Sequence, residues 1–248
     1  MKGRLLEVEM EDPFSNLSLE EALFRKLGGP TLRVWENQRS VVIGRAQLAE
    51  FETDLGYCRK NSVPVVRRIT AGGAVYNGPG NLNWSFFVPR ASGGEGAWKT
   101  DDAKGVFSSF ASLVAGALVK CGVDCRFRPP NSIVDGRGKI CGMAAYLSKD
   151  RVLCHGTLLI GADLTEVERL TRPSEARLHR RYPRSSFAKV SNCGVDRGDF
   201  VKELARGSGG VFEEGSLTAS EKELASSLLV RYRSEKWNLG DPFLLDDL

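Results

Sequence analysis

The sequence predicts an α+β fold in which a mixed, largely antiparallel sheet is flanked by helices. Three observations lead to this prediction. Short apolar segments with strand character follow one another in blocks and do not alternate strictly with helices, as a doubly wound fold would require. Tight-turn sequences join several of these segments, and Asp135-Gly136-Arg137-Gly138 is the clearest of them. With 248 residues, the chain can bury the core of one large domain.

The predicted elements follow from local patterns. Residues 16–27 have leucines on one helical face, with Ser18 to Glu21 as cap and first turn, and Gly28-Gly29-Pro30 ends this helix. Further helices are expected at residues 102–121, 164–170, 199–205 and 218–232, the last opened by the capping signal Thr218-Ala219-Ser220-Glu221. Strands are expected at residues 32–35, 41–43, 63–69, 82–88, 125–127, 132–134, 139–147 and 152–160.

The composition restricts the classes of partner. Hydrophobic residues make up 42% and charged residues 27% of the chain, and a net charge of +4 does not require nucleic acid. No apolar run reaches bilayer length, and the N-terminal residues contain no apolar signal region. We therefore expect a cytoplasmic protein that binds neither nucleic acid nor a membrane.

Six cysteines occur without a CxxC pair or a zinc-finger spacing. In a chain without a secretion signal, free thiols in a reducing compartment are expected, mostly as small core residues.

One glycine-rich segment predicts a site for an anionic small molecule. Arg67 and Arg68 lead into Gly72-Gly73, and a second glycine-rich stretch, residues 77–81, follows. Glycines allow the backbone to approach a ligand, and guanidinium groups suit phosphate or carboxylate. A nucleotide or an acyl-adenylate would fit. A hairpin with solvated arginines is an equally good interpretation of this segment alone, which matches neither the P-loop nor the GxGxxG pattern.

Two other segments carry chemically useful residues. Lys139 follows a tight turn and opens an apolar strand, so its amine is expected to be partly solvated and able to hold a phosphate or carboxylate oxygen. His155, one of two histidines, lies in the predicted strand 152–160. Taken singly, a turn lysine is usually solvent-exposed and a strand histidine is usually structural.

Taken together, the three segments resemble the catalytic domain of the lipoate–protein ligase family, within the biotin/lipoyl protein ligase superfamily. The family signature reads roughly RRxTGGGAVYHDxGNLN, RNDIxxxGKKISGxA and HHGTLLI. This chain has RRITAGGAVYNGPGNLN, NSIVDGRGKICGMA and CHGTLLI in the same order. Residues 16–21, 41–50, 184–192 and 237–242 are similar to further family segments, so the resemblance covers most of the chain.

The resemblance implies an ATP-dependent ligase with a biotin/lipoyl ligase-like catalytic domain. Such an enzyme converts lipoate and ATP, with Mg²⁺, to lipoyl-AMP and transfers the lipoyl group to a lysine of a lipoyl carrier domain. Residues 1–240 would form the catalytic domain. Residues 241–248 would be a short tail without the accessory domain, which implies a separate accessory chain.

The resemblance also implies roles for individual residues. Lys139 would be catalytic, binding the lipoyl carbonyl and α-phosphate oxygens. Arg68 with Gly72 and Gly73 would form the cradle of the lipoyl-adenylate. Asn81 would bind near the nucleotide, and the loop from Ser186 to Val190 would close over it. Other residues expected to contact substrate or adenylate are Ala74, Tyr76, Asn131, Gly142, His155, Gly156 and Thr157. No metal ligand is assigned.

Three departures from the signature affect these roles. Ala71 replaces a glycine, which narrows the slot if that position needs a positive φ. Asn77-Gly78 replaces His-Asp, and Gly78-Pro79-Gly80 is similar to the octanoyl-transferase branch. Ser132 replaces an aspartate, which removes a carboxylate that could help hold magnesium and ATP.

The main alternative is an ATP-independent, cysteine-dependent octanoyl or lipoyl transferase that uses an acyl-carrier thioester. Cys125, beside two arginines, is its candidate nucleophile, with Cys141 and Cys154 also near Lys139. Biotin ligase chemistry is disfavoured because the chain has no GRGRxGR-type loop. A non-catalytic lipoyl-binding or nucleic-acid-binding module is a third alternative. We interpret the arginine-rich residues 172–184 as a docking surface for an acidic carrier domain.

Overall fold

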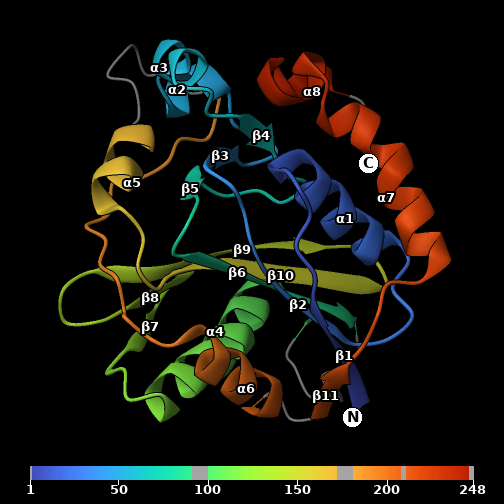
Figure 1. The fold of residues 1–248 in the computed structure, drawn as a ribbon, viewed down its shortest axis with the longest axis vertical. Helices are drawn as coiled ribbons and strands as arrows, with labels where there is room; N and C mark the ends of the chain where they lie inside the picture. Colours follow the sequence, from blue (N-terminus) through green and yellow to red (C-terminus); the bar gives the residue numbers. More distant parts are fainter. Residues whose placement is uncertain (1, 91–99, 172–180, 208–210, 246–248) are drawn as a thin grey trace.

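A mixed eight-stranded sheet crosses the molecule, seen nearly edge-on in Figure 1. The computed structural model describes residues 2–90, 100–171, 181–207 and 211–245. The strand order is β11-β1-β2-β6-β10-β9-β8-β7, and β1 runs parallel to β11 and β2, whereas the other pairs are antiparallel. The strands are β1 (Lys2–Glu7), β2 (Thr31–Glu36), β6 (Asn81–Pro89), β7 (Arg126–Arg128), β8 (Ser132–Val134), β9 (Lys139–Leu147), β10 (Arg151–Leu159) and β11 (Val211–Glu214). The predicted α+β class is confirmed.

Helices cover both faces of this sheet. In Figure 1, α4 (Ala103–Lys120) and α6 (Arg197–Gly207) lie below it, whereas α1 (Pro13–Arg25) and α7 (Ala219–Tyr232) lie above it. A small sheet also lies above, in the order β4-β3-β5, with β3 (Ser40–Ile43), β4 (Val65–Arg67) and β5 (Val75–Asn77). The shorter helices are α2 (Ala49–Glu52), α3 (Leu55–Lys60), α5 (Leu164–Leu170) and α8 (Glu235–Leu239), and Pro242–Leu244 forms a 3₁₀ turn.

Strand alternation divides the sheet between core and site. Trp84 and Phe86 of β6 enter the core beneath the sheet with Phe110 of α4, whereas Phe87 enters the core above it. Between these residues, Ser85 points upward with Asn83, toward the gap between the large and small sheets. The upper face is therefore apolar under α1 and polar where a cavity opens.

Helix α4 is long and apolar enough to cross a membrane by length and composition alone, with a mean hydropathy of 1.2. This finding departs from the expectation that no segment would reach that length. One face of α4, including Val106, Phe110 and Val114, is buried in the core beneath the sheet. The helix thus packs as a sheet-covering core helix.

Several element boundaries differ from the prediction. Helix α1 begins at Pro13, because the Asp12 carboxylate caps it by accepting a hydrogen bond from Ser15 N at 2.7 Å. Glu20 and Glu21 are therefore buried in mid-helix and do not form a first turn. Strand β5 lies inside the glycine-rich segment, between the strands predicted at residues 63–69 and 82–88, where no strand was predicted. The elements β1, β11, α2, α3 and α8 were not predicted, because short elements rely on partners far away in sequence.

Candidate active site

Two cavities, of about 240 and 180 Å³, lie between the upper face of the large sheet and the small sheet. We call the larger one the outer cavity and the smaller one the inner cavity. They share lining residues from four segments: Ala74, Val75, Lys139, Gly142, Thr157, Ser185 and Ser186. A ligand with two chemically different ends could therefore occupy both and present its central part to Lys139.

The inner cavity combines apolar walls with a polar floor. Leu17, Trp35 and Val42 contribute apolar surface, and Asn83 and His155 contribute polar atoms. Its floor depends on small residues of the central strands. A Cβ at Gly156 would lie 2.5 Å from the Trp84 ring, and a Cβ at Gly142 would lie 2.8 Å from Lys139 Nζ. Gly142 thus leaves the space into which the lysine side chain extends, whereas Gly156 leaves room for the Trp84 ring in the core beneath the sheet.

The outer cavity is enclosed by α5 and by the segment 185–190. Leu164 and Val167 of α5 form an apolar side with Leu159, and Tyr76 and Asn81 lie among the polar lining residues. The sequence did not assign α5 to the site, since its apolar residues are also typical of a helix that packs on a core.

Lys139 begins β9 immediately after the turn at Asp135. Its backbone N–H donates to Lys189 O at 2.8 Å, and its carbonyl accepts from Ser191 N at 3.0 Å. Within the described part of the chain, its ammonium group makes no hydrogen bond or ion pair. Burial lowers the pKa of Lys139, and the positive charges of Arg128 and Arg68 lower it further, against an opposing effect of Cys141. A partly desolvated cation without a protein partner is suited to hold a substrate anion.

The two adjacent arginines of the glycine-rich segment have different roles. Arg67 is fully buried and donates to six backbone carbonyls. Its guanidinium group is therefore not available to bind a ligand, in contrast to the prediction from the sequence. These acceptors belong to Gly44, Arg45, Gln47, Trp237, Asn238 and Gly240. Arg67 therefore ties the segment after β3 to the segment around α8.

Arg68 lines the inner cavity and also sets the shape of the glycine-rich segment. Its Nη2 donates to Ala71 O at 2.8 Å and to Gly73 O at 2.9 Å, around Gly72 at φ +99°. Gly72 itself does not appear among the described lining residues, but the positive φ at this position favours glycine. Ala71 has no positive φ, so the alanine that departs from the family pattern fits its backbone without strain.

Polar contacts join His155, which lines the inner cavity, to α1 and to the glycine-rich segment. His155 Nε2 lies 2.8 Å from Thr70 Oγ1, and His155 Nδ1 lies 2.8 Å from Glu20 Oε1. Ser85 Oγ donates to the same Glu20 oxygen at 2.6 Å. His155 thus lines the cavity, as expected, and is at the same time held by buried partners that the sequence did not identify.

Ser185 connects the closing segment to the glycine-rich segment. Its Oγ accepts from Ala74 N at 2.7 Å and from Gln47 Nε2 at 3.1 Å, and its N–H donates to Glu52 Oε2 at 3.1 Å. Gln47 belongs to a family-like motif noted in the sequence, and this signal could have identified its supporting role. Glu52 had no such signal.

The structure brings the expected site residues together. Arg68, Gly73, Asn131, His155 and Gly156 line the inner cavity, and Tyr76, Asn81 and Val190 line the outer one. Lys139, Ala74, Gly142, Thr157 and Ser186 line both.

Cys125, the nucleophile of the alternative mechanism, is misplaced for that role. It lines neither cavity, and its Sγ lies 3.9 Å from Ala115 O of α4, against the core beneath the sheet. Burial raises the pKa of Cys125 to about 11 and that of Cys141 to about 12, and it also raises the pKa of the other four thiols. A thiolate nucleophile would need the opposite shift.

The described residues of the site do not form a metal site of their own. Among the described residues, no group of three or more His, Cys, Asp or Glu side chains could hold a metal ion. Glu168 is the one carboxylate among the residues described as lining the two cavities. The polar surface of the site therefore favours anions over free cations.

Comparisons with known proteins agree with this geometry. Residues 12–194 match the family model of the lipoyl protein ligase A/B catalytic domain. Lipoate-protein ligase A subunit 1 of Thermoplasma acidophilum is 30% identical, over 97% of this chain and 97% of that protein.

Two solved structures have the same fold over nearly the whole chain. A bi-partite lipoate protein ligase, solved with its E2 lipoyl domain from Thermoplasma acidophilum, has a TM-score of 0.85 at 29% identity, covering 100% of this chain and 99% of that one. A lipoate-protein ligase A bound with ATP has a TM-score of 0.83 at 30% identity, covering 97% of this chain and 99% of that one. Since the family model spans more than half of the sequence, the chain belongs to the lipoyl protein ligase A/B catalytic-domain family.

Proposed function

We propose that this protein is an ATP-dependent lipoate–protein ligase. It forms lipoyl-AMP from lipoate and ATP and passes the lipoyl group to a lysine of a lipoyl carrier domain. One observation carries the proposal: the ammonium group of Lys139, which makes no hydrogen bond or ion pair with the described residues, lies where an inner cavity with apolar walls meets a separate outer cavity. The similarity to a lipoate-protein ligase A bound with ATP supports it.

In the first step, the lipoyl chain occupies the inner cavity and the nucleotide occupies the outer one. A carboxylate oxygen of lipoate attacks the α-phosphorus, a new P–O bond forms, and the bond to the β-phosphate oxygen breaks to release pyrophosphate. Lys139 contacts both reacting anions and offsets their charge in the transition state. Holding the two substrates in contact also removes much of the entropic cost of their encounter.

In the second step, the amine of the carrier lysine attacks the acyl carbon of lipoyl-AMP. The C–O bond to phosphate breaks, AMP leaves with the bonding pair, and the amine loses a proton to solvent. No thiol takes part, in agreement with the raised pKa values of the cysteines. Lys139 again stabilises the departing phosphate.

We propose that Mg²⁺ enters with ATP and is held mainly by phosphate oxygens and water. The described lining residues supply only the Glu168 carboxylate, and Ser132 stands where the family pattern has an aspartate. No protein site for the ion is therefore assigned, and no step depends on one.

The partners follow from the same comparison. A structural neighbour is a bi-partite ligase solved with its E2 lipoyl domain, so we propose a lipoyl carrier domain and a separate accessory chain as partners here. Residues 172–180 of the expected arginine-rich docking surface lie outside the described residues, and that role stays a prediction. The domain boundary at residue 240 likewise stays a prediction. All six cysteines are free, which supports a cytoplasmic location.

The decisive test is mass spectrometry of the purified chain after incubation with lipoate and magnesium-ATP, with and without the candidate accessory chain. We expect lipoyl-AMP from the wild type and none from Lys139→Met. Acyl transfer from an octanoyl-carrier thioester in the absence of ATP, together with no lipoyl-AMP under any condition, would reject the ligase in favour of the transferase.

A further inference from the structure

A third cavity, of about 420 Å³, opens beside the outer cavity and is rich in positive charge. It shares Phe187, Ala188 and Lys189 with the outer cavity. Its other lining residues come from β7 and the turn before Lys139: Arg126, Arg128, Val134, Asp135, Gly136, Arg137 and Gly138. We call this cavity the basic groove.

Strand β7 places two arginines on one face. Arg126 pairs with Val134 and Arg128 with Ser132, so the two arginines are two residues apart and share a face. Phe127, between them, packs instead against the core beneath the sheet. Both guanidinium groups consequently line the groove on the side of the sheet that carries the active site.

The cations of the groove are largely uncompensated. Within the described chain, Arg126, Arg128 and Lys189 make no side-chain hydrogen bond or ion pair. The carboxylate of Asp135 is already occupied, because it binds Arg137, the Ser191 hydroxyl and two backbone N–H groups. These hydrogen bonds outweigh the effect of burial and lower the pKa of Asp135 to about 2. The negative charge of Asp135 thus interacts with groups of its own turn and with Ser191, and not with Arg126, Arg128 or Lys189.

The groove adjoins the outer cavity that Lys139 lines, because the two cavities share Phe187, Ala188 and Lys189. Gly138 and Lys189, which line it, flank Lys139 through the chain and through the backbone hydrogen bond from Lys139 N to Lys189 O at 2.8 Å. After the larger effect of burial, the charge of Arg128 contributes to the lowered pKa of Lys139. An anion in the groove would therefore lie close to one bound at the Lys139 ammonium.

We propose that the basic groove binds the β- and γ-phosphates of ATP and holds pyrophosphate as it leaves. This inference rests on the proposed function and names the site that binds pyrophosphate, the leaving group of the adenylation step. Two phosphates carry several negative charges, and planar guanidinium groups bind phosphate oxygens with paired hydrogen bonds. Arg128 stands opposite Ser132, the position where the family pattern has an aspartate. In this chain, Arg128 would therefore neutralise phosphate charge beside Ser132, where the family's aspartate is absent.

A simpler interpretation is that the arginines only protect the exposed edge of the sheet, since β7 is its last strand. That interpretation explains charge on β7 but requires no pyrophosphate affinity. An acidic carrier domain is the other candidate occupant of a basic surface. Both interpretations make predictions that differ from ours.

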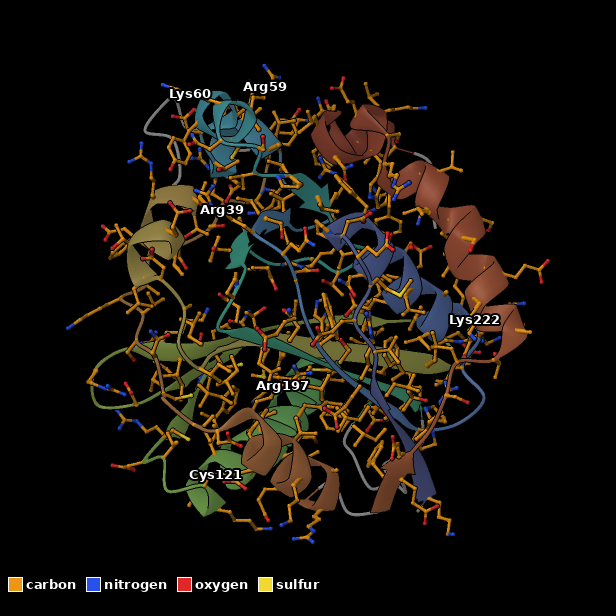
Figure 2. All side chains as sticks on the ribbon, in the orientation of Figure 1. Arg39, Arg59, Lys60, Cys121, Arg197 and Lys222 are labelled. Atoms are coloured by element: carbon orange, nitrogen blue, oxygen red, sulfur yellow. The ribbon has the colours of Figure 1, made fainter. Side chains whose placement is uncertain are left out.

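The test compares Arg126→Gln, Arg128→Gln and the double variant with Arg59→Gln. Arg59 is also an exposed arginine, on α3, and Figure 2 shows it at the opposite end of the molecule from β7. Calorimetric titration with sodium pyrophosphate and magnesium chloride should show binding by the wild type. We expect each single β7 variant to weaken it about tenfold and the double variant more, with Arg59→Gln within about twofold. Thermal unfolding should be unchanged, because these side chains are exposed and unpaired.

Transfer from synthetic lipoyl-AMP to the carrier is the second readout, because pyrophosphate takes no part in it. We expect all variants to retain the wild-type rate there. Wild-type pyrophosphate affinity in the double variant, or no binding by the wild type, would overturn the inference. Slower transfer with unchanged pyrophosphate affinity would assign the groove to the carrier. If the β7 variants bind pyrophosphate more weakly but the wild type never makes lipoyl-AMP, the groove would remain a pyrophosphate site and the proposed function would be rejected.

Discussion

The imidazole Nδ1 of His155 lies 2.8 Å from Oε1 of Glu20, a carboxylate that is 1% exposed in the middle of α1. Burial raises the pKa of Glu20, but the charge and hydrogen bond of His155, the Ser85 hydroxyl and Arg33 together lower it. Glu20 is therefore ionised and accepts from Nδ1, and the other ring nitrogen, Nε2, lies 2.8 Å from Thr70 Oγ1. Thr70 Oγ1 in turn accepts from Arg68 Nε at 2.8 Å. A continuous set of hydrogen bonds thus links α1 to the glycine-rich segment.

Glu20→Gln should disturb the inner cavity more than the outer one. The amide keeps the volume but lacks the charge that orients His155, so we expect the KM for lipoate to rise about tenfold and the KM for ATP to change less than about twofold. Steady-state kinetics with each substrate varied will measure this split. Glu21→Gln is the matched control, since Glu21 is a buried neighbour on α1 that binds Tyr232 and Arg231. Equal effects on both KM values would contradict a positioning role for Glu20.

Lys139→Met should abolish adenylation, with a loss of at least about 100-fold, because one anion-stabilising group is removed. The folded-state pKa of Lys139 lies below its ordinary value. Burial of the charged ammonium therefore lowers the free energy of unfolding at any pH below the folded-state pKa, and this loss disappears as the pH rises above the pKa of lysine in the unfolded chain.

The Lys139→Met variant should consequently unfold at a higher temperature than the wild type at pH 7. The adenylation rate of the wild type should fall at alkaline pH, earlier than for an ordinary lysine. A Lys139→Met protein with normal lipoyl-AMP formation would remove Lys139 from the mechanism.

Cys125→Ser should keep both half-reactions within about twofold of the wild type. Its thiol lies against α4, outside both cavities, and burial raises its pKa to about 11. Activity and intact-protein mass spectrometry will check this prediction. An acyl adduct on Cys125 during turnover would instead support the transferase.

The sequence predicted the composition of the site better than the roles within it. Motif order was sufficient to bring Lys139, Asn81 and His155 to one place, because those positions recur in a known pattern. It could not separate Arg67 from Arg68, since the carbonyls that bind Arg67 include those around α8, about 170 positions along the chain. Glu20 was overlooked for a different reason. The helix was predicted to begin at residue 16, but α1 begins at Pro13. The prediction therefore placed Glu20 in the first turn of the helix, although it is buried in the middle.

Asp135→Asn should destabilise the turn that positions Lys139, in a pH-dependent manner. The carboxylate accepts from Gly138 N at 2.8 Å and from Ser191 Oγ at 2.9 Å, and its pKa falls to about 2 because such hydrogen bonds outweigh burial. A depressed carboxylate pKa gives stability that is complete above the unfolded value near 3.8 and is lost as the pH falls toward 2. After allowance for solvent screening, we expect about 1 kcal/mol at pH 7. Urea unfolding at pH 7 and near pH 2.5 should show the difference between variant and wild type shrinking at the lower pH. A pH-independent difference would mean that the side chain acts through its shape, since the charge would then contribute nothing.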